Sequence, residues 1–169
     1  TRIIDADLRV FEAVAEAAAR GVIFDVGHGS GSFQWETVEA CIDQGLPPTT
    51  ISTDLHTRNL HGPVYDMPTT MSKFLMLGLS LEDVVEMSTT SPAKILKREG
   101  ELGTLCIGSV ADVTVLERRE GRFVFEDSYD GTRVGDTLLV AAATVRRGEI
   151  VPGGGGLRMR RLESGSAPG

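Results

Sequence analysis

The sequence predicts an α/β protein in which helices cover parallel strands, followed by a small antiparallel β module. The first part is predicted because an amphipathic helix pattern is twice followed by a short β-rich run that leads into a polar loop. Strands that alternate with helices in this way usually pair in parallel. The second part is predicted because, beyond Gly100, β-rich runs alternate with Gly and Asp turns and helical periodicity is lost.

The first predicted helix and strand occupy the N-terminal segment. Between Asp7 and Ala18 the apolar residues are three or four positions apart, which is typical of a helix with Asp7 as its N-cap and Gly21 just after its end. Residues 22–26 are rich in β-branched and aromatic side chains, and they precede a cluster of glycines. This run predicts a buried strand.

The same pattern is repeated once along the chain. Apolar positions from Trp35 to Ile42 predict a second helix that ends at Gly45. Residues 49–53 predict a second short strand, which leads into Asp54.

Three more helices and then β structure are predicted. Ser80 followed by Asp83 forms a capping box, and Pro92 is typical of a first helical turn. The helices are expected at residues 71–77, 81–88 and from 91 onward, and the β-rich runs at residues 110–116, 122–126 and 138–145.

Composition excludes several classes of protein. The 169 residues contain 17 Lys+Arg and 24 Asp+Glu, for a net charge of −7, and 41% are hydrophobic. We expect a globular protein without a nucleic-acid partner, because the one dense basic run, residues 158–161, lies in a Gly-rich terminal segment. No membrane association is expected, since no apolar run approaches about 18 residues. Cys41 and Cys106 lack metal-ribbon or disulfide spacing, which favours the reducing cytoplasm.

Residues able to carry chemistry follow the two predicted strands. His28, His56 and His61 all lie after a strand, and Asp54 ends the second one. Ligand sites of α/β proteins form at the C-terminal ends of parallel strands. Alternatives stay open, because a loop histidine is often only solvated and a terminal aspartate is often only a cap. The glycines of residues 27–31 indicate a phosphate cradle only weakly, since the P-loop ending is absent.

Five segments in a fixed order carry a resemblance to a known family. They are FDVGHGSGSF (24–33), ISTDLH (51–56), GPVYDMPTTMSKFL (62–75), TSPAKIL (90–96) and GTLCIGSVADVTVL (103–116). In this order they resemble the C-terminal part of the amidohydrolase superfamily, in its deacetylase branch near dihydroorotases and D-aminoacylases. The likeness runs from the start of the sequence to about Val151.

The resemblance implies a fold and a domain division. Residues 1–99 would form the last strands and helices of a (β/α)8 TIM-type barrel, and residues 100–151 part of a small β-sandwich module. Residues 152–169 are expected to form a flexible tail. Because a whole barrel takes about 250 residues, we expect this chain to be the C-terminal part of a longer enzyme, or a remnant of one.

The resemblance also implies a zinc-dependent hydrolase that cleaves an amide or ester bond of a small molecule with metal-activated water. Asp54 would bind one or two Zn²⁺ ions and shuttle the proton, while His28, Gly29 and His56 would bind substrate. The sequence has no His-x-His pair, so we expect the other metal ligands from a missing N-terminal barrel segment. Assembly as a homo-oligomer stays open. The alternatives are a non-catalytic α/β subunit or scaffold without a complete metal site, and a phosphate-sugar- or nucleotide-binding half-barrel.

Overall fold

The computed structural model describes residues 2–151. The predicted tail, residues 152–169, lies outside the described residues. Within the described range, no helix has both the length and the apolar character needed to cross a membrane. The elements are α1 (Glu12–Ala19), β1 (Asp25–Gly27), α2 (Trp35–Asp43), β2 (Thr50–Ser52), α3 (Met67–Met76), α4 (Leu81–Ser88), α5 (Thr90–Ile95), β3 (Val113–Glu126), β4 (Thr132–Arg146) and β5 (Glu149–Ile150).

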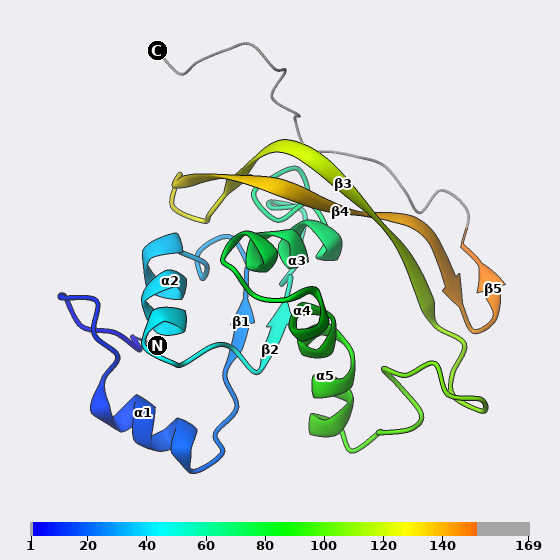
Figure 1. The fold of residues 1–169 in the computed structure, drawn as a ribbon, viewed down its shortest axis with the longest axis horizontal. Helices are drawn as coiled ribbons and strands as arrows, with labels where there is room; N and C mark the ends of the chain where they lie inside the picture. Colours follow the sequence, from blue (N-terminus) through cyan, green and yellow to red (C-terminus); the bar gives the residue numbers. More distant parts are fainter. Residues whose placement is uncertain (1, 152–169) are drawn as a thin grey trace.

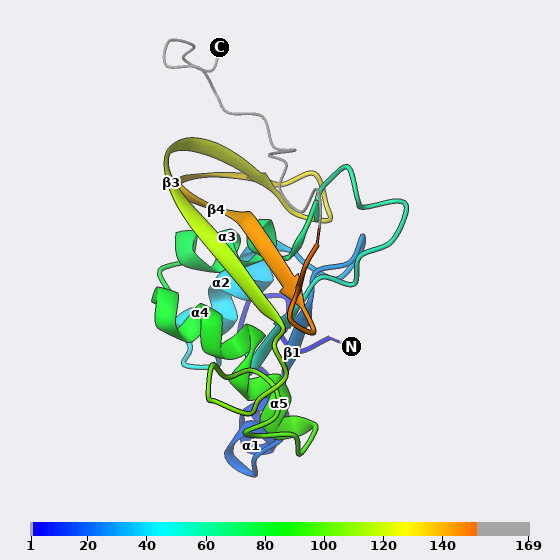
Figure 2. The same ribbon diagram turned by 90° about the vertical axis from the view of Figure 1, so that its right-hand side faces the viewer.

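The structure confirms the α/β class and the predicted parallel pair. β1 and β2 pair in parallel, with Val26 opposite Ile51. Figure 1 shows α2 on one side of this pair and α4 and α5 on the other, with the long β3–β4 hairpin arching over α3. In the perpendicular view of Figure 2 the hairpin again covers α3, while α1 and α5 lie at the far end of the molecule.

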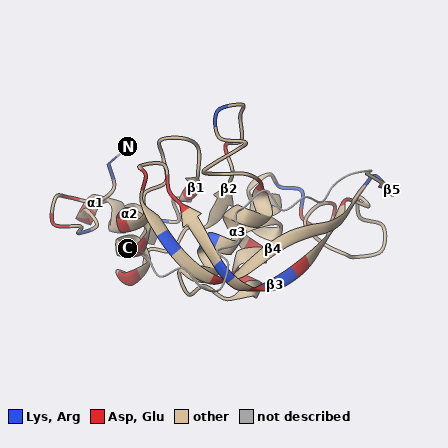
Figure 3. Ribbon diagram, turned by 90° about the horizontal axis from the view of Figure 1, so that it is seen from above, with Lys and Arg blue, Asp and Glu red and all other residues tan. Residues whose placement is uncertain are grey.

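The hairpin is longer and more continuous than the sequence predicts. β3 and β4 are antiparallel, and β5 extends the sheet beside β4. Residues 113–116 of the first predicted run and all of the run at 122–126 belong to the single strand β3, whereas residues 110–112 precede it. A bulge between Glu120 and Phe123 absorbs the glycine between the two runs without ending the pairing. Figure 3 shows basic and acidic residues interspersed along this hairpin. One such pair is Arg119 and Glu117, whose Nε and Oε1 atoms are 2.8 Å apart.

The predicted start of the first helix is wrong. α1 begins at Glu12, and Asp7 does not cap it. Instead, Asp5 Oδ1 accepts hydrogen bonds from the backbone N–H groups of Asp7 and Arg9, both at 2.9 Å. This local turn holds Leu8 at a φ of 60°, outside the helical region, and so competes successfully with the helix.

The predicted buried strand at residues 22–26 is also wrong in extent and burial. β1 comprises only Asp25–Gly27, and it pairs with β2 alone. Val22 and Ile23 are 49% and 47% exposed. No element among the described residues covers these two side chains, so they stay exposed although the strand pattern predicts burial.

The second helix and the helices from α3 to α5 follow the sequence pattern closely. In α4, Ser80 Oγ accepts from the Asp83 N–H at 3.0 Å, which confirms the predicted capping box. α3 begins earlier than expected because Asp66 Oδ1 caps it through the Thr69 N–H at 2.7 Å. α3 then packs under the hairpin, where the backbone N–H of Leu139 donates to Ser72 Oγ at 2.8 Å.

The core lies between α3, the hairpin and the segment that enters α2. Its aromatic centre is Phe33, whose ring meets Trp35 and Phe74 edge to face, with centroids 4.9 and 5.9 Å away. Such edge-to-face contacts favour one arrangement of the rings. The other buried members are Val38, Ile51, Met71, Val84, Phe123, Phe125, Leu138, Leu139 and Val140.

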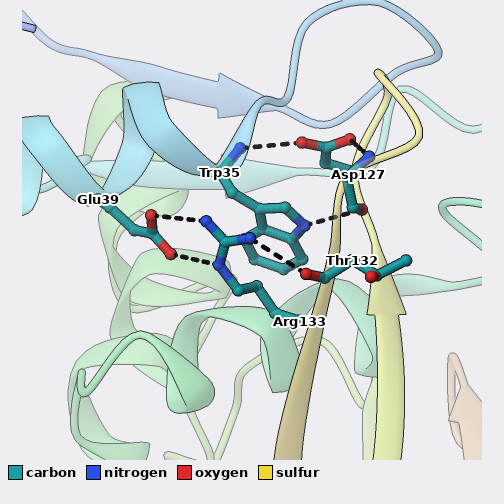
Figure 4. Close-up of polar contacts among 6 residues, drawn as sticks. Trp35, Glu39, Asp127, Thr132 and Arg133 are labelled. Carbon is teal, nitrogen blue, oxygen red and sulfur yellow. Dashed lines mark hydrogen bonds and ion pairs between the residues drawn. The ribbon is translucent and has the colours of Figure 1, made fainter. Parts of the chain in front are cut away.

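A buried carboxylate fastens the hairpin to α2 (Figure 4). Asp127, 5% exposed, accepts from the N–H groups of Tyr129 and Gly131 through Oδ1, at 2.8 and 2.7 Å. Its Oδ2 accepts from the Trp35 N–H at 3.1 Å, one of the N-terminal amides that α2 leaves unpaired. The Trp35 indole N–H donates in turn to the Gly131 carbonyl at 3.1 Å.

An ion pair reinforces the same junction. Arg133 Nε and Nη2 donate to the two carboxylate oxygens of Glu39 at 2.9 and 3.1 Å, which links β4 to α2 (Figure 4). The geometry is bidentate, and the side chains of Arg133 and Glu39 are 39% and 35% exposed. The buried Asp127 therefore stabilises the junction between the hairpin and α2 more than this solvated ion pair does.

Asp127→Ala should destabilise the full-length protein by about 2 to 4 kcal/mol, because three backbone N–H groups lose a charged acceptor in a buried place. The free energy of unfolding from urea titration measures this loss. Asp43→Ala, which removes an exposed carboxylate from the last turn of α2, is the matched control and should change stability by less than about 0.5 kcal/mol. Equal losses in the two variants would contradict the role of Asp127.

Candidate functional site

The loop after β1 lies against the end of β2. This loop, residues 27–31, is called the glycine loop below. The His28 N–H donates to the Ser52 carbonyl at 3.0 Å, and the Gly29 N–H donates to the Thr53 carbonyl at 3.1 Å. Hydrogen bonds between the two segments thus continue past β1, which places the glycine loop directly beside Asp54.

Asp54 faces this loop from an unusual backbone conformation. Its φ is +46°, in the left-handed region. Gly29 also has a positive φ, +54°, and a Cβ at this position would lie 2.7 Å from Asp54 Oδ2. Only glycine therefore allows the carboxylate to approach the loop so closely.

The Asp54 backbone is fixed while its carboxylate stays open. Asn59 Nδ2 donates to the Asp54 carbonyl at 3.0 Å, and Asn59 is itself fully buried. Within residues 2–151, no hydrogen bond engages the Asp54 carboxylate, and the residue is exposed. An exposed, unpaired carboxylate on a fixed backbone is suited to bind a cation or to exchange a proton.

His56 also reaches the glycine loop. Its Nδ1 accepts from the Arg58 N–H at 3.2 Å, so Nε2 carries the proton and donates to Ser30 Oγ at 3.1 Å. Asn59 Oδ1 accepts from the His56 N–H at 2.8 Å. The structure therefore brings three of the predicted site residues, Asp54, Gly29 and His56, to one place. His61 is exposed on the loop that follows.

His28 lies beneath the glycine loop, fully buried. Its ring stacks on Phe33, with centroids 4.5 Å apart and planes 9° from parallel. Nδ1 lies 3.0 Å from the Gly29 carbonyl and Nε2 lies 2.5 Å from Lys73 Nζ. The ring is therefore enclosed by the described residues, and a contact between His28 and substrate stays a prediction.

Lys73, which the sequence analysis did not single out, is buried in the same place. Its Nζ donates to the Pro63 carbonyl at 2.9 Å and to the Glu126 carbonyl at 2.5 Å, in addition to the His28 ring. The available signal was a lysine in the middle of an apolar helical face, between Met71 and Phe74. Such a lysine is buried only when its ammonium group finds several acceptors.

Burial shifts the pKa values of both partners. Loss of solvent lowers the pKa of Lys73 to about 7, and the nearby carboxylates of Glu126 and Asp127 oppose this decrease. Loss of solvent is the larger cause that lowers the pKa of His28, and the charge of Lys73 is the next; together they lower it to about 4. The His28 ring is therefore neutral at physiological pH, with Nε2 as acceptor and Nδ1–H as donor.

The turn of the hairpin holds the glycine loop from its other side. Ser128 Oγ lies 3.2 and 3.3 Å from the carbonyl oxygens of His28 and Gly29 and donates to them. The Tyr129 hydroxyl donates to the Gly31 carbonyl at 2.8 Å. The glycine loop is thus fixed by contacts with residues about 100 positions away in the sequence.

The described residues do not form a complete metal centre. Among residues 2–151 there is no group of three or more His, Cys, Asp or Glu side chains placed to hold a metal ion. Asp54 fits as one oxygen ligand of zinc, whereas a catalytic zinc site takes about three protein ligands.

The fold and this arrangement define an α/β protein with a carboxylate site at the ends of parallel strands. The sequence profile described as the amidohydrolase family matches residues 11–142, and the chain belongs to this family. The resemblance that the five motifs indicate is thereby confirmed.

Individual relatives agree with this membership. A deacetylase of Agrobacterium fabrum is 42% identical over 111 residues, which are 66% of this chain and 27% of the relative. The crystal structure of an adenine deaminase matches with a TM-score of 0.82 at 33% identity, over 88% of this chain and 41% of that one. For a dihydroorotase crystal structure the TM-score is 0.76, again at 33% identity, with coverage of 88% and 39%. The chain thus spans about a quarter to two fifths of the length of these proteins.

The folded protein should become less stable as the pH decreases from about 7 to about 5. The pKa of His28 is about 4 in the folded state and 6.5 without the shift, so the unfolded chain binds more protons between these values. His28 alone lowers the free energy of unfolding by about 2 kcal/mol between pH 7 and pH 5. Urea unfolding of the full-length protein at both pH values measures the loss, and His28→Gln should lose about that much less. Equal losses in both proteins would contradict the buried neutral ring.

Proposed function

We propose that this chain is the C-terminal part of a metal-dependent amidohydrolase that cleaves an amide bond of a small molecule, or an ester bond by the same route. The observation that carries the proposal is the Asp54 carboxylate, which is exposed and unpaired among the described residues and lies close to Gly29 at the end of β2. Relatives named deacetylases support the choice of an acyl-nitrogen bond.

In this proposal β1 and β2 are the last strands of a (β/α)8 barrel. Three features support it: the strands are parallel, they pair only with each other among the described elements, and their C-terminal ends lead into the candidate site. The exposed Val22 and Ile23 would be covered by a preceding strand. Residues 1–99 would then be barrel, and residues 100–151 part of a β-sandwich module.

The metal would be zinc, with Asp54 as one ligand and the remaining ligands from outside this chain. Bound zinc lowers the pKa of water and polarises a scissile carbonyl. An Asp oxygen is among the ligands that zinc accepts. The fixed Asp54 backbone keeps the carboxylate in place for this contact.

Asp54 would also move the proton. One carboxylate oxygen accepts a proton from the attacking water, and the same group then delivers it to the leaving nitrogen or oxygen. Gly29 lies next to the Asp54 carboxylate, and His56 reaches the same loop through Ser30, so we assign substrate contact to the Gly29 main chain and to the His56 imidazole. We assign His28 to the support beneath them, because its ring is buried.

Asp54→Asn in the full-length protein should reduce kcat by at least about a thousandfold. Asparagine tolerates a positive φ, so the backbone should keep its conformation while the proton acceptor is lost. Rates with a panel of N-acetylated amino acids and with p-nitrophenyl acetate measure the effect, and elemental analysis measures bound zinc. Asp130→Asn is the matched control, since Asp130 also has a positive φ, of 63°, and lies in the exposed hairpin turn. Near wild-type turnover in Asp54→Asn would contradict the role of Asp54, whereas no turnover in the wild type would favour the scaffold alternative.

Gly29→Ala should also impair hydrolysis, because its Cβ would displace Asp54 Oδ2 or the loop. A shift of about 1 Å at a reacting group reduces the rate by about a hundredfold. Gly31→Ala serves as the control, since a Cβ there meets no atom within 4 Å and the residue has no positive φ. Similar values of kcat/KM in the two variants, with the same probes, would argue against the contact between Gly29 and Asp54 as a feature of the active site.

A further inference from the structure

Lys73 is a fully buried lysine that the proposed reaction does not use. Its ammonium group has three acceptors, and each comes from a different part of the chain. The His28 ring belongs to the glycine loop, the Pro63 carbonyl to the segment before α3, and the Glu126 carbonyl to the end of β3. Lys73 itself is in α3, so one side chain joins four segments.

Stability alone does not account for a lysine at this position. Transfer of an ammonium group out of water costs several kcal/mol, and an apolar side chain of similar volume is often at least as stabilising in such a place. None of the three acceptors is a carboxylate oxygen, so no direct ion pair offsets the cost. What the three directed hydrogen bonds do provide is a fixed geometry among the segments that they connect.

A continuous series of contacts leads from Lys73 to the candidate site. Lys73 donates to His28 Nε2, and His28 Nδ1–H then donates to the Gly29 carbonyl. Gly29 lies against Asp54, with no room for a Cβ between them. Phe33 holds the ring in this orientation by stacking on it.

We propose that Lys73 is a positioning residue of the active site, which acts through the His28 ring to fix the glycine loop against the Asp54 carboxylate. This role rests on the proposed function, although the hydrogen-bonded series can be tested without it. Because Lys73 occupies Nε2 as donor, the proton of the neutral ring must reside on Nδ1.

The ring tautomer gives a test that needs no substrate. In full-length protein labelled with ¹⁵N-histidine, His28 is identified as the signal absent from the His28→Gln variant. We expect the Nδ1–H tautomer in the wild type, and a changed ¹⁵N shift at Nε2 in Lys73→Met, where the donor is gone. An Nε2–H tautomer in the wild type, or the same Nε2 shift in both proteins, would overturn the proposal.

Kinetics test the effect on the site. Lys73→Met should lower kcat per bound zinc by about 10- to 100-fold with the amide and ester probes, as expected for a misplaced reacting group. Lys94→Met, which removes an exposed lysine from α5, is the control and should stay within about twofold. An unchanged kcat per zinc in Lys73→Met would overturn the positioning role, because a merely structural residue would lower only the amount of active protein.

A second pair of variants applies if Lys73→Met does not fold. His28→Gln keeps an amide oxygen that can accept from Lys73, whereas His28→Leu does not. We expect a smaller loss of kcat in the glutamine variant, and equal losses would overturn the proposal. If Asp54→Asn keeps full activity, the proposed function fails instead, and the tautomer measurement still decides whether the contact between Lys73 and His28 exists.

Discussion

The end of β3 is the place on which the arrangement of this molecule depends, and one buried carboxylate holds it. Asp127 takes hydrogen bonds from the turn of the hairpin and from the first amide of α2, two segments that are almost 100 residues apart. Because the turn is held there, Ser128 and Tyr129 reach the carbonyl groups of the glycine loop. The neighbouring Glu126 carbonyl accepts from Lys73. The hairpin therefore supports the candidate site although it carries none of the proposed chemistry.

The glycine loop lies between a buried region on one side and an exposed carboxylate on the other. Beneath it, His28 and Phe33 are fully buried, and every buried side-chain nitrogen and oxygen of residues 2–151 has a hydrogen-bond partner, as low solvent access requires. Above it, the Asp54 carboxylate is exposed and unpaired among the described residues. A group that must exchange protons needs access to substrate, while its backbone needs a fixed position. The buried side supplies the fixed position, and the exposed side supplies the access.

Local sequence signals predicted much of this fold but not what holds it together. The parallel pair and the capping box at Ser80 follow from periodicity and from contacts within a few residues, and Asp54 and the glycine loop meet because parallel strands end at one edge. Lys73 was missed because its partners are 10 to 53 residues away in the sequence, where no local pattern indicates them. The role of Asp127 was missed because its bond to Trp35 spans 92 residues. The exposure of Val22 also escaped prediction, since burial depends on neighbours that a strand pattern does not specify.

These contacts also bear on how the proposed active site is divided between this chain and the rest of the protein. Among the described residues Asp54 is a single candidate ligand, and no ligand cluster accompanies it. Yet its backbone is held within this chain by the hydrogen bond from Asn59 to its carbonyl, and its carboxylate lies so close to Gly29 that a Cβ there would be 2.7 Å from Oδ2. A ligand whose backbone is fixed in advance loses less entropy when it binds a cation. In the proposed enzyme, other segments therefore need to supply the missing ligands, whereas the placement of the proton-transfer group is encoded here.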